Sequence, residues 1–454
     1  MRKSLTDLPS TWMRALDSVG LWIVLLLIVG VSLHFSLPPW LSLYREVAAG
    51  LFTVLLCLRG SIRISRETIA LLGYVALLSL LAITQAPGRL LYDELGVISE
   101  WQAEHPLLSQ FRSAMLYVPM VIYLSTRRIS HKELTRIAWT MTAAIPIALG
   151  AFIPGRGVVS LTELSRTGGN ELGYLDFLPL LAFYGLAGCY LLQIKQKPLA
   201  RFVVFTNLWL LAAILVVSTG RQNVVWMIVV FAINMLTTEG RTRRTTIMAT
   251  LVAACVIGAA ATMYVMTYGA SAKFLDRFTS IDGFLDLSPT ELENDSSRAA
   301  LALTGLKMIK PTEWPLGIGL ESCPGPGPHC DYIRQVMRGG LLLVILGYLP
   351  CAMAIRRGWR AKHRERRSPL SAWMCGMAFF PIYFALFGFP REDACKAFAS
   401  FLGLGLCIAL DRSTSIQNQA VARSSRTLAR RNMPSTCNVW PVTGSVKAGS
   451  IRHR

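Results

Sequence analysis

Leu21-Trp-Ile-Val-Leu-Leu-Leu-Ile-Val-Gly-Val-Ser-Leu-His-Phe35 is an almost uninterrupted apolar run near the start of the chain. A second such run covers 202–217, and similar runs separated by short charged clusters recur along most of the 454 residues. A helix needs about 20 mainly apolar residues to cross a membrane. Because 53% of the residues are hydrophobic and only 16% are charged, the sequence predicts an all-α polytopic membrane protein without a separate soluble domain.

The apolar runs and the breakers between them predict about twelve transmembrane helices. The predicted spans lie near 18–37, 46–58, 68–84, 113–125, 137–153, 174–192, 202–217, 222–237, 246–268, 335–355, 371–389 and 396–410. Basic residues precede the first span and no small-residue cleavage site follows it, which favours an uncleaved anchor over a removed signal peptide. We therefore expect a cytoplasmic N-terminus at 1–17, a membrane domain at 18–410 and a tail at 411–454.

The Lys and Arg residues are unevenly shared between the two sides of the predicted bundle. With the N-terminus inside, the cytoplasmic segments hold about two thirds of the 46 Lys and Arg residues but only about a quarter of the 26 acidic residues. Cytoplasmic loops of membrane proteins carry such an excess of basic residues. The sequence therefore predicts N-in, C-in topology, with a basic tail that we expect to be disordered and to lie against anionic lipid.

The net charge of +20 would suggest nucleic-acid binding in a soluble protein. Here the basic residues lie between the spans and no nucleic-acid-binding motif accompanies them, so we expect membrane lipids and no nucleic acid as partners. Most of the ten cysteines fall in apolar segments, where a buried free thiol is the expected state. Cys323 and Cys330 lie in a polar loop, where a disulfide and two free thiols are both open.

Three predicted outward segments exceed a minimal turn, at 85–112, 154–173 and 269–334. The last is the largest, and it begins with loosely spaced acidic residues. Residues 296–309 then follow a 3.6-residue apolar period, which predicts an amphipathic helix lying on the membrane surface. A Pro- and Gly-rich stretch over 311–328 completes this segment. We expect one large periplasmic loop, and we expect it to carry much of the functional site.

Four arginines on the outward side are candidate anion-binding residues. Arg221 lies in the short turn Ser-Thr-Gly-Arg between two spans, and Arg298 heads the predicted amphipathic helix. Arg166 lies beside a Gly-rich turn, and Arg338 lies one turn into the span that follows the large loop. A guanidinium offers a planar fork of N–H donors that suits phosphate oxygens. The alternative for each is an arginine that reaches lipid headgroups or solvent and has no further role.

The end of the large loop adds further candidates. His329 follows the rigid Pro/Gly run and could act as a general base near neutral pH, and Asp331 is a second candidate base. Tyr332 and Trp314 offer rings for sugar stacking, with an ordinary membrane-interface aromatic as the alternative for Trp314. The outward loops contain no Asp-x-Asp pair, and the chain has no Walker or dinucleotide-binding pattern. We therefore expect neither a metal nor a cofactor.

Taken in order, these pieces resemble the O-antigen ligase and polymerase superfamily of bacterial envelope enzymes. The matching stretch runs from about Arg166 to Pro350 and contains Arg166-Thr-Gly-Gly-Asn-Glu, Ser218-Thr-Gly-Arg221, Ser297-Arg298, Trp314-Pro-Leu-Gly-Ile-Gly319 and His329-Cys-Asp-Tyr332, followed by Gly339-Gly-Leu. Two features depart from the family pattern. The turn reads Thr-Gly-Arg where the family has Ser-Arg, and Cys330 stands where Asn or Ser is commoner. The first 150 residues match in topology only.

The resemblance implies a glycan on undecaprenyl diphosphate as the donor, presented at the periplasmic face of the bacterial inner membrane. Arg221 and Arg298, assisted by Arg166, would stabilise the charge that develops on the leaving diphosphate. His329 or Asp331 would orient or deprotonate a sugar hydroxyl of the acceptor. The transfer would invert the anomeric carbon and would need no metal.

Two acceptors are open within this superfamily. A polymerase joins the glycan to another lipid-linked repeat unit of O-antigen or exopolysaccharide, whereas a ligase joins it to lipid A core. We favour the polymerase, for which a chain-length regulator is a candidate partner. A lipid-linked glycan flippase is the alternative from another class, although the chain shows no internal repeat of the kind that transporters carry.

Overall fold

The computed structural model of the chain describes residues 10–33, 43–59, 64–84, 106–127, 129–155, 172–194, 197–217, 225–226, 228–230, 306–307, 309–317, 330–364, 369–386 and 395–410. All of them belong to one unit, Met1–Asp411. Helices are the regular structure of these residues, and the described ranges contain no strand, which confirms the predicted all-helical class. The predicted disordered tail at 411–454 lies outside the described residues.

The described helices follow the predicted spans closely. They are α1 (Ser10–Ser32), α2 (Tyr44–Arg59), α3 (Arg66–Thr84), α5 (Pro106–Thr126), α6 (His131–Gly155), α8 (Leu172–Gln193), α9 (Pro198–Val217), α16 (Asp331–Arg364), α17 (Pro369–Phe384) and a last helix over Cys395–Leu410. The predicted span 246–268 lies outside the described residues, and 222–237 is described only at 225–226 and 228–230. Several helices begin before the apolar run that predicted them, because polar residues can form a first helical turn at a membrane surface.

Three described helical segments are long and apolar enough to cross a membrane. They are Trp12–Ser32, His131–Ala151 and Asp331–Trp359. Shorter apolar helical segments accompany them, at Leu178–Gln193, Pro198–Ala212, Pro369–Phe384 and Cys395–Leu410. These segments are those of a membrane protein, as the sequence predicts. The count of about twelve spans and the N-in, C-in topology stay predictions.

The exposed side of α2 is apolar along its length. Val47, Leu51, Val54 and Leu58 recur every three or four residues and are 45% to 59% exposed, whereas Phe52 on the other side is fully buried. Water would solvate such a continuous stripe poorly. The acyl chains of a bilayer would solvate it well, so the stripe supports a membrane setting independently of helix length.

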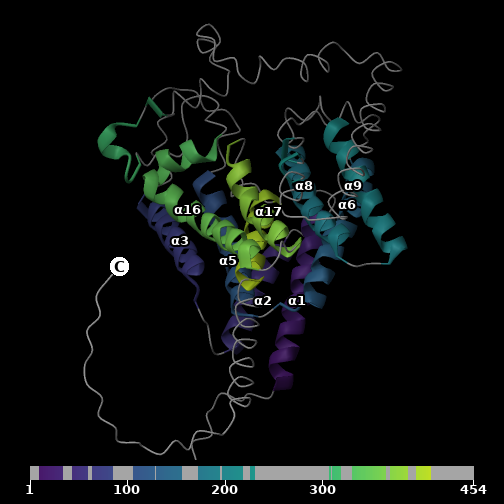
Figure 1. Ribbon diagram of the computed structural model, residues 1–454. Helices are drawn as coiled ribbons and strands as arrows, with labels where there is room; N and C mark the ends of the chain where they lie inside the picture. The colour runs from purple at the N-terminus through teal and green to yellow at the C-terminus, as the bar shows by residue number, and fades with distance from the viewer. Residues whose placement is uncertain are drawn as a thin grey trace, which may run out of the picture. The chain divides into compact units, whose positions relative to one another are not determined.

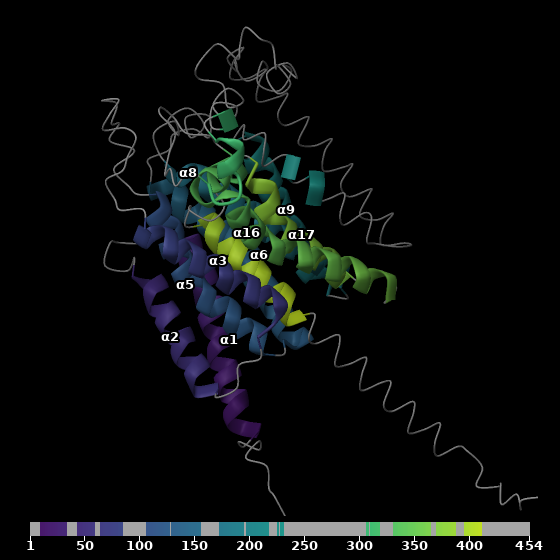
Figure 2. The ribbon, with the colours of Figure 1, turned by 90° about the vertical axis from the view of Figure 1, so that its left-hand side faces the viewer.

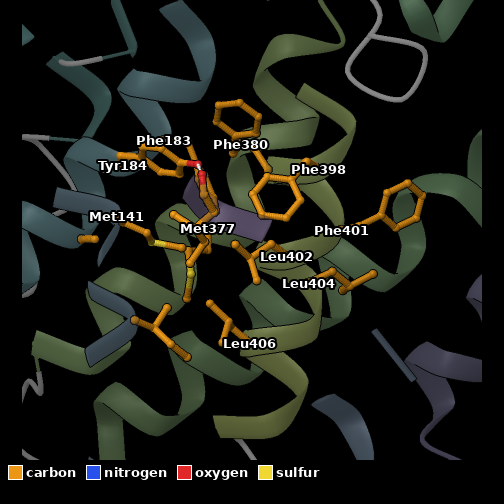
Figure 3. Close-up of a cluster of buried hydrophobic side chains, with 14 of the residues drawn as sticks. Met141, Phe183, Tyr184, Met377, Phe380, Phe398, Phe401, Leu402, Leu404 and Leu406 are labelled. Atoms are coloured by element: carbon orange, nitrogen blue, oxygen red, sulfur yellow. Dashed lines mark hydrogen bonds between the residues drawn. The ribbon is translucent and has the colours of Figure 1, made fainter. Parts of the chain in front are cut away.

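The centre of the bundle is filled by large apolar side chains from α6, α8, α17 and the helix Cys395–Leu410 (Figure 3). Phe183 of α8 meets Phe380 of α17 edge-on, with the ring centroids 5.1 Å apart. Gly403 lets the last helix approach α17 closely, because a Cβ there would lie 2.9 Å from the carbonyl oxygen of Met377. Close packing of this kind holds helices together where lipid replaces water.

Ion pairs join the helix ends that the charge bias assigns to the cytoplasm. The Asp17 carboxylate of α1 lies 2.7 Å from the Arg59 guanidinium of α2 and 3.9 Å from Arg127, just beyond α5. Arg127 also pairs with Glu133 in the first turn of α6. Arg127 is almost fully buried, so its charge needs partners inside the protein. The carboxylates of Asp17 and Glu133, from two different helices, provide them. This network ties four helices together at one end.

Helix α16 lies between α3 and α17 (Figures 1 and 2). Its Arg357 pairs with the fully buried Glu67 of α3 at 2.7 Å between the guanidinium and the carboxylate. At the other end, a Cβ on Gly339 would lie only 2.8 Å from the side chain of Leu81. Residue numbers therefore rise along α16 as they fall along α3, and the two helices pack antiparallel.

Helix α16 is interrupted at Gly339 and Gly340, where the backbone angles leave the helical region. Such a break leaves the N–H groups of the next turn without their usual helical acceptors. The preceding loop, which contains the 3-10 turn η3 (Pro311–Glu313), supplies one acceptor. The Leu341 N–H donates to the Trp314 carbonyl oxygen at 2.8 Å.

The same loop supplies a second acceptor through a backbone-to-backbone contact. The Leu342 N–H donates to the Pro315 carbonyl oxygen at 3.3 Å. Gly317 and Gly340 both have positive φ, at 76° and 68°. A Cβ on Gly317 would lie 2.6 Å from the Gly340 nitrogen, and a Cβ on Gly340 would lie 2.2 Å from the Pro315 oxygen. Only glycine fits at both positions.

We expect the substitution Gly340→Ala to lower the free energy of unfolding by at least about 2 kcal/mol, because it combines a steric clash with a backbone conformation that only glycine adopts readily. Gly150→Ala in α6 is the matched control, since a Cβ added there would have no atom within 4 Å. That change should shift stability by less than about 1 kcal/mol. Thermal unfolding in mild detergent measures both, and equal midpoints for the two variants would contradict the backbone contact.

Candidate functional site

Half of the predicted site residues lie in the described part of the chain. Those described are Trp314, Asp331, Tyr332 and Arg338. Those outside the described residues are Arg166, Arg221, Arg298 and His329. The structure brings the described residues together around the first turns of α16, at the end that the charge bias assigns to the outward side.

Asp331 is the first residue of α16, which corrects the prediction that it lies in the loop before a span starting at 335. Its backbone N–H donates to the Ala385 carbonyl oxygen at 2.8 Å, just beyond α17. This bond satisfies a donor at the start of α16 and allows the helix to begin before the apolar run. The Asp331 side chain is fully buried, and a negative charge in a first helical turn also interacts favourably with the helix dipole.

The Asp331 carboxylate accepts hydrogen bonds from its own helix. The Gln335 side-chain amide lies 3.2 Å from Oδ1 and 3.4 Å from Oδ2. The Tyr348 hydroxyl, on the far side of the break in α16, donates to Oδ2. Hydrogen bonds to a carboxylate are shorter and stronger than those between neutral groups. This environment suits a carboxylate that orients its neighbours.

Tyr332 is partly buried against the same group. Its hydroxyl donates to the Ile382 carbonyl oxygen of α17 at 2.8 Å. Its ring packs against the ring of Tyr348, with centroids 4.7 Å apart. Tyr332 therefore joins α16 to α17, and the predicted sugar-stacking role stays a prediction.

The sequence left open that the Arg338 side chain reaches the lipid headgroups or solvent. The structure contradicts this alternative. The Arg338 side chain is fully buried. One terminal guanidinium nitrogen donates to the Gln110 amide oxygen of α5 at 2.7 Å. The bond to a neighbouring helix holds the guanidinium inside the bundle.

Gln110 and Tyr74 complete this group, and the sequence predicts neither of them as a site residue. Gln110 is almost fully buried in α5 and donates from its amide nitrogen to the Tyr74 hydroxyl of α3. A chain of hydrogen bonds thus runs from α16 through α5 to α3. The sequence predicts Gln110 in the outward loop at 85–112, but α5 already begins at Pro106.

Trp314 lies in the loop that caps the break in α16. Its ring is partly buried against a small apolar cluster of Ile309, Val336 and Met337. Of the predicted amphipathic helix, 306–307 are helical and Ile309 is buried, while the rest lies outside the described residues. Trp314 therefore fixes the loop to α16 through both its ring and its carbonyl group.

Cys330 directly precedes α16 and carries a free thiol. Burial raises the pKa of this thiol above its ordinary value, which disfavours the reactive thiolate. Cys323, its partner in the disulfide that the sequence leaves open, lies outside the described residues. Among the described side chains, no group of three or more His, Cys, Asp or Glu residues is arranged to hold a metal ion.

The arrangement places a buried carboxylate and a buried guanidinium on one helix. Asp331 and Arg338 are two helical turns apart, roughly 10 Å along the axis at about 1.5 Å per residue. Both lie within the apolar segment Asp331–Trp359. Ionisable side chains inside such a segment are costly to bury, and they commonly mark a substrate or ion site. A guanidinium offers a planar set of N–H donors that suits an anion such as phosphate.

No protein-family model matches this chain, and no curated protein sequence matches it significantly.

We expect Tyr348→Phe to destabilise the protein by about 2 kcal/mol, because the lost hydrogen bond has a buried carboxylate as its acceptor. Tyr332→Phe is the matched control, since it removes the same hydroxyl from the neighbouring ring but loses only a bond to a neutral carbonyl, worth about 1 kcal/mol. Denaturant or thermal unfolding in detergent compares the two variants. A larger loss for Tyr332→Phe would contradict the stronger hydrogen bond expected between Tyr348 and the Asp331 carboxylate.

Proposed function

We propose that this protein is a membrane glycosyltransferase that takes a glycan from a polyprenyl-diphosphate carrier and joins it to a sugar hydroxyl at the periplasmic face of the bacterial inner membrane. The observation that supports this proposal most directly is Arg338, a fully buried arginine hydrogen-bonded at the outward end of an apolar helix. That helix directly follows the large loop in which the sequence places Arg298, Trp314 and His329.

The chemistry of the proposed donor fits arginine better than it fits an acid. In the transfer, the acceptor oxygen forms a new bond to the anomeric carbon while the bond from that carbon to the diphosphate oxygen breaks. The bonding electrons leave with the polyprenyl diphosphate, and the hydroxyl proton passes to a base. Because negative charge develops on the diphosphate, fixed cations in a site shielded from water would stabilise the transition state by several kcal/mol.

The candidate residues take separate roles in this proposal. Arg221 and Arg298 contact the diphosphate, assisted by Arg166. His329 accepts the hydroxyl proton. Asp331, already hydrogen-bonded to Tyr348 and Gln335, orients the start of α16. Inversion of the anomeric carbon follows from direct attack on the face opposite the diphosphate.

The proposed acceptor is a second lipid-linked repeat unit, which makes the protein a polymerase of O-antigen or exopolysaccharide repeat units. A chain-length regulator is then its proposed partner. A ligase would use the same donor site and the same leaving group but would accept lipid A core. The two differ only in the acceptor that enters beside the donor.

One observation favours a second candidate function, a flippase for the same lipid-linked glycan. Asp331 and Arg338 are ionisable groups buried within a helix long enough to cross a membrane, and transporters place such groups along a substrate path. A flippase would move the glycan across the membrane and would need no base. The absence of an internal repeat in the sequence argues against this alternative.

The enzyme and transporter functions can be separated with purified protein in liposomes containing a lipid-linked repeat unit. The wild type should produce longer lipid-linked chains. Arg221→Ala and Arg298→Ala should each slow the transfer at least about 100-fold, because each removes a cation from the developing charge. Arg112→Ala is the control, since Arg112 forms an exposed ion pair with Glu46 on the surface of α5 and should leave the rate within about twofold.

Product analysis distinguishes the outcomes of this assay. Addition of lipid A core to the same liposomes identifies a ligase by the appearance of a conjugate. If the wild type makes no longer chains and no conjugate, the glycosyltransferase proposal is wrong. If Arg221→Ala and Arg298→Ala both match the wild type, the proposed cation stabilisation is wrong.

The proposed topology has a test that does not depend on catalysis. In a variant whose ten cysteines are replaced, Thr312→Cys in η3 and Lys132→Cys in α6 place single thiols at exposed positions. A membrane-impermeant maleimide should label Thr312→Cys in intact spheroplasts and Lys132→Cys only after lysis. The reverse pattern would overturn the N-in, C-in topology and the periplasmic site with it.

A further inference from the structure

Gln110 occupies a junction between helices that are distant in sequence. Its side chain is almost fully buried, and its amide oxygen lies 2.7 Å from a terminal nitrogen of Arg338. Its amide nitrogen donates to the Tyr74 hydroxyl, whose residue is also fully buried. One amide therefore connects α16, α5 and α3 at the level of the arginine.

The direction of this amide is determined by its partners. A guanidinium carries only donors, so the Gln110 oxygen must face Arg338. The amide nitrogen must then face Tyr74, whose hydroxyl can accept. An amide held at both ends has no alternative orientation, so it restricts the position of the guanidinium.

The partner that Gln110 provides is neutral. A carboxylate at this position would form a charge-assisted, two-point pair with the guanidinium and would cancel its charge. A glutamine amide makes a hydrogen bond of similar geometry and adds no negative charge beside the guanidinium. Because the guanidinium is planar, holding one terminal nitrogen also limits the plane in which its other N–H groups can point.

We infer that Gln110, supported by Tyr74, is a positioning residue that orients the Arg338 guanidinium toward the diphosphate of the lipid-linked donor. This inference rests on the proposed function. It assigns a role to α3 and α5, which contain none of the residues that the sequence marked as candidates.

Two substitutions at Gln110 separate positioning from a purely structural role. Gln110→Glu keeps the shape of the side chain and an acceptor for Arg338, but it adds a negative charge beside the guanidinium. We expect this variant to retain a thermal midpoint close to that of the wild type while the KM for the lipid-linked donor rises at least about tenfold. Gln110→Leu removes the hydrogen bonds without adding a charge, and it should lower kcat at least about tenfold.

The control for both readouts is Arg112→Gln. Arg112 lies two residues further along α5 on its exposed side, and in the described contacts it pairs only with surface Glu46.

A purely structural Gln110 would give variants that differ from the wild type in stability but not in kcat or KM per folded molecule. A Gln110→Glu variant with wild-type kcat and KM would therefore overturn the inference while leaving the proposed function intact. Should Gln110→Leu fail to fold, Gln110→Glu alone decides between the two roles. A wild type that transfers no glycan would overturn the proposed function, and this inference with it.

Discussion

Helix α16 places two fully buried ionisable side chains, Asp331 and Arg338, in the interior of the bundle, where lipid and water can solvate neither of them. Asp331 therefore needs hydrogen-bond partners along its own helix, and Arg338 needs one from a neighbouring helix. Tyr348 and Gln335 meet the carboxylate, and Gln110 meets the guanidinium. For the guanidinium, α5 meets this requirement directly through Gln110, and α3 supports it through Tyr74.

The helical class and most helix positions could be predicted from the sequence because long apolar runs have no other stable arrangement. Helix ends were less predictable, since they depend on partners that the run itself does not contain. α16 begins at Asp331 and not at 335 because the Ala385 carbonyl accepts its first N–H. α5 begins at Pro106, outside its apolar run, so the predicted loop wrongly included Gln110.

The candidate site was predictable in part, for a related physical reason. Arginines near the outward surface stand out in an apolar sequence, and Arg338 is identifiable in this way. Its partner is not, because Gln110 is 228 residues away and an uncharged amide gives little signal on its own. Gln110 and Tyr117 lie two turns apart on the buried side of α5. This spacing is the one feature of the sequence that indicates that Gln110 faces the bundle interior. The Pro- and Gly-rich composition of the loop before α16 predicts that it is not a regular helix. Its backbone contact with Gly340 depends on three-dimensional packing and could not be predicted.

The backbone contact at the break in α16 also bears on how the chain enters the membrane. The carbonyl groups of Trp314 and Pro315, which accept the freed N–H groups of Leu341 and Leu342, belong to residues that the ribosome makes first. When α16 leaves the ribosome, the acceptors for its irregular turn are therefore already present on the preceding segment. An unpaired backbone N–H is costly in hydrocarbon, so the order of synthesis allows the helix and its acceptors to insert as one unit.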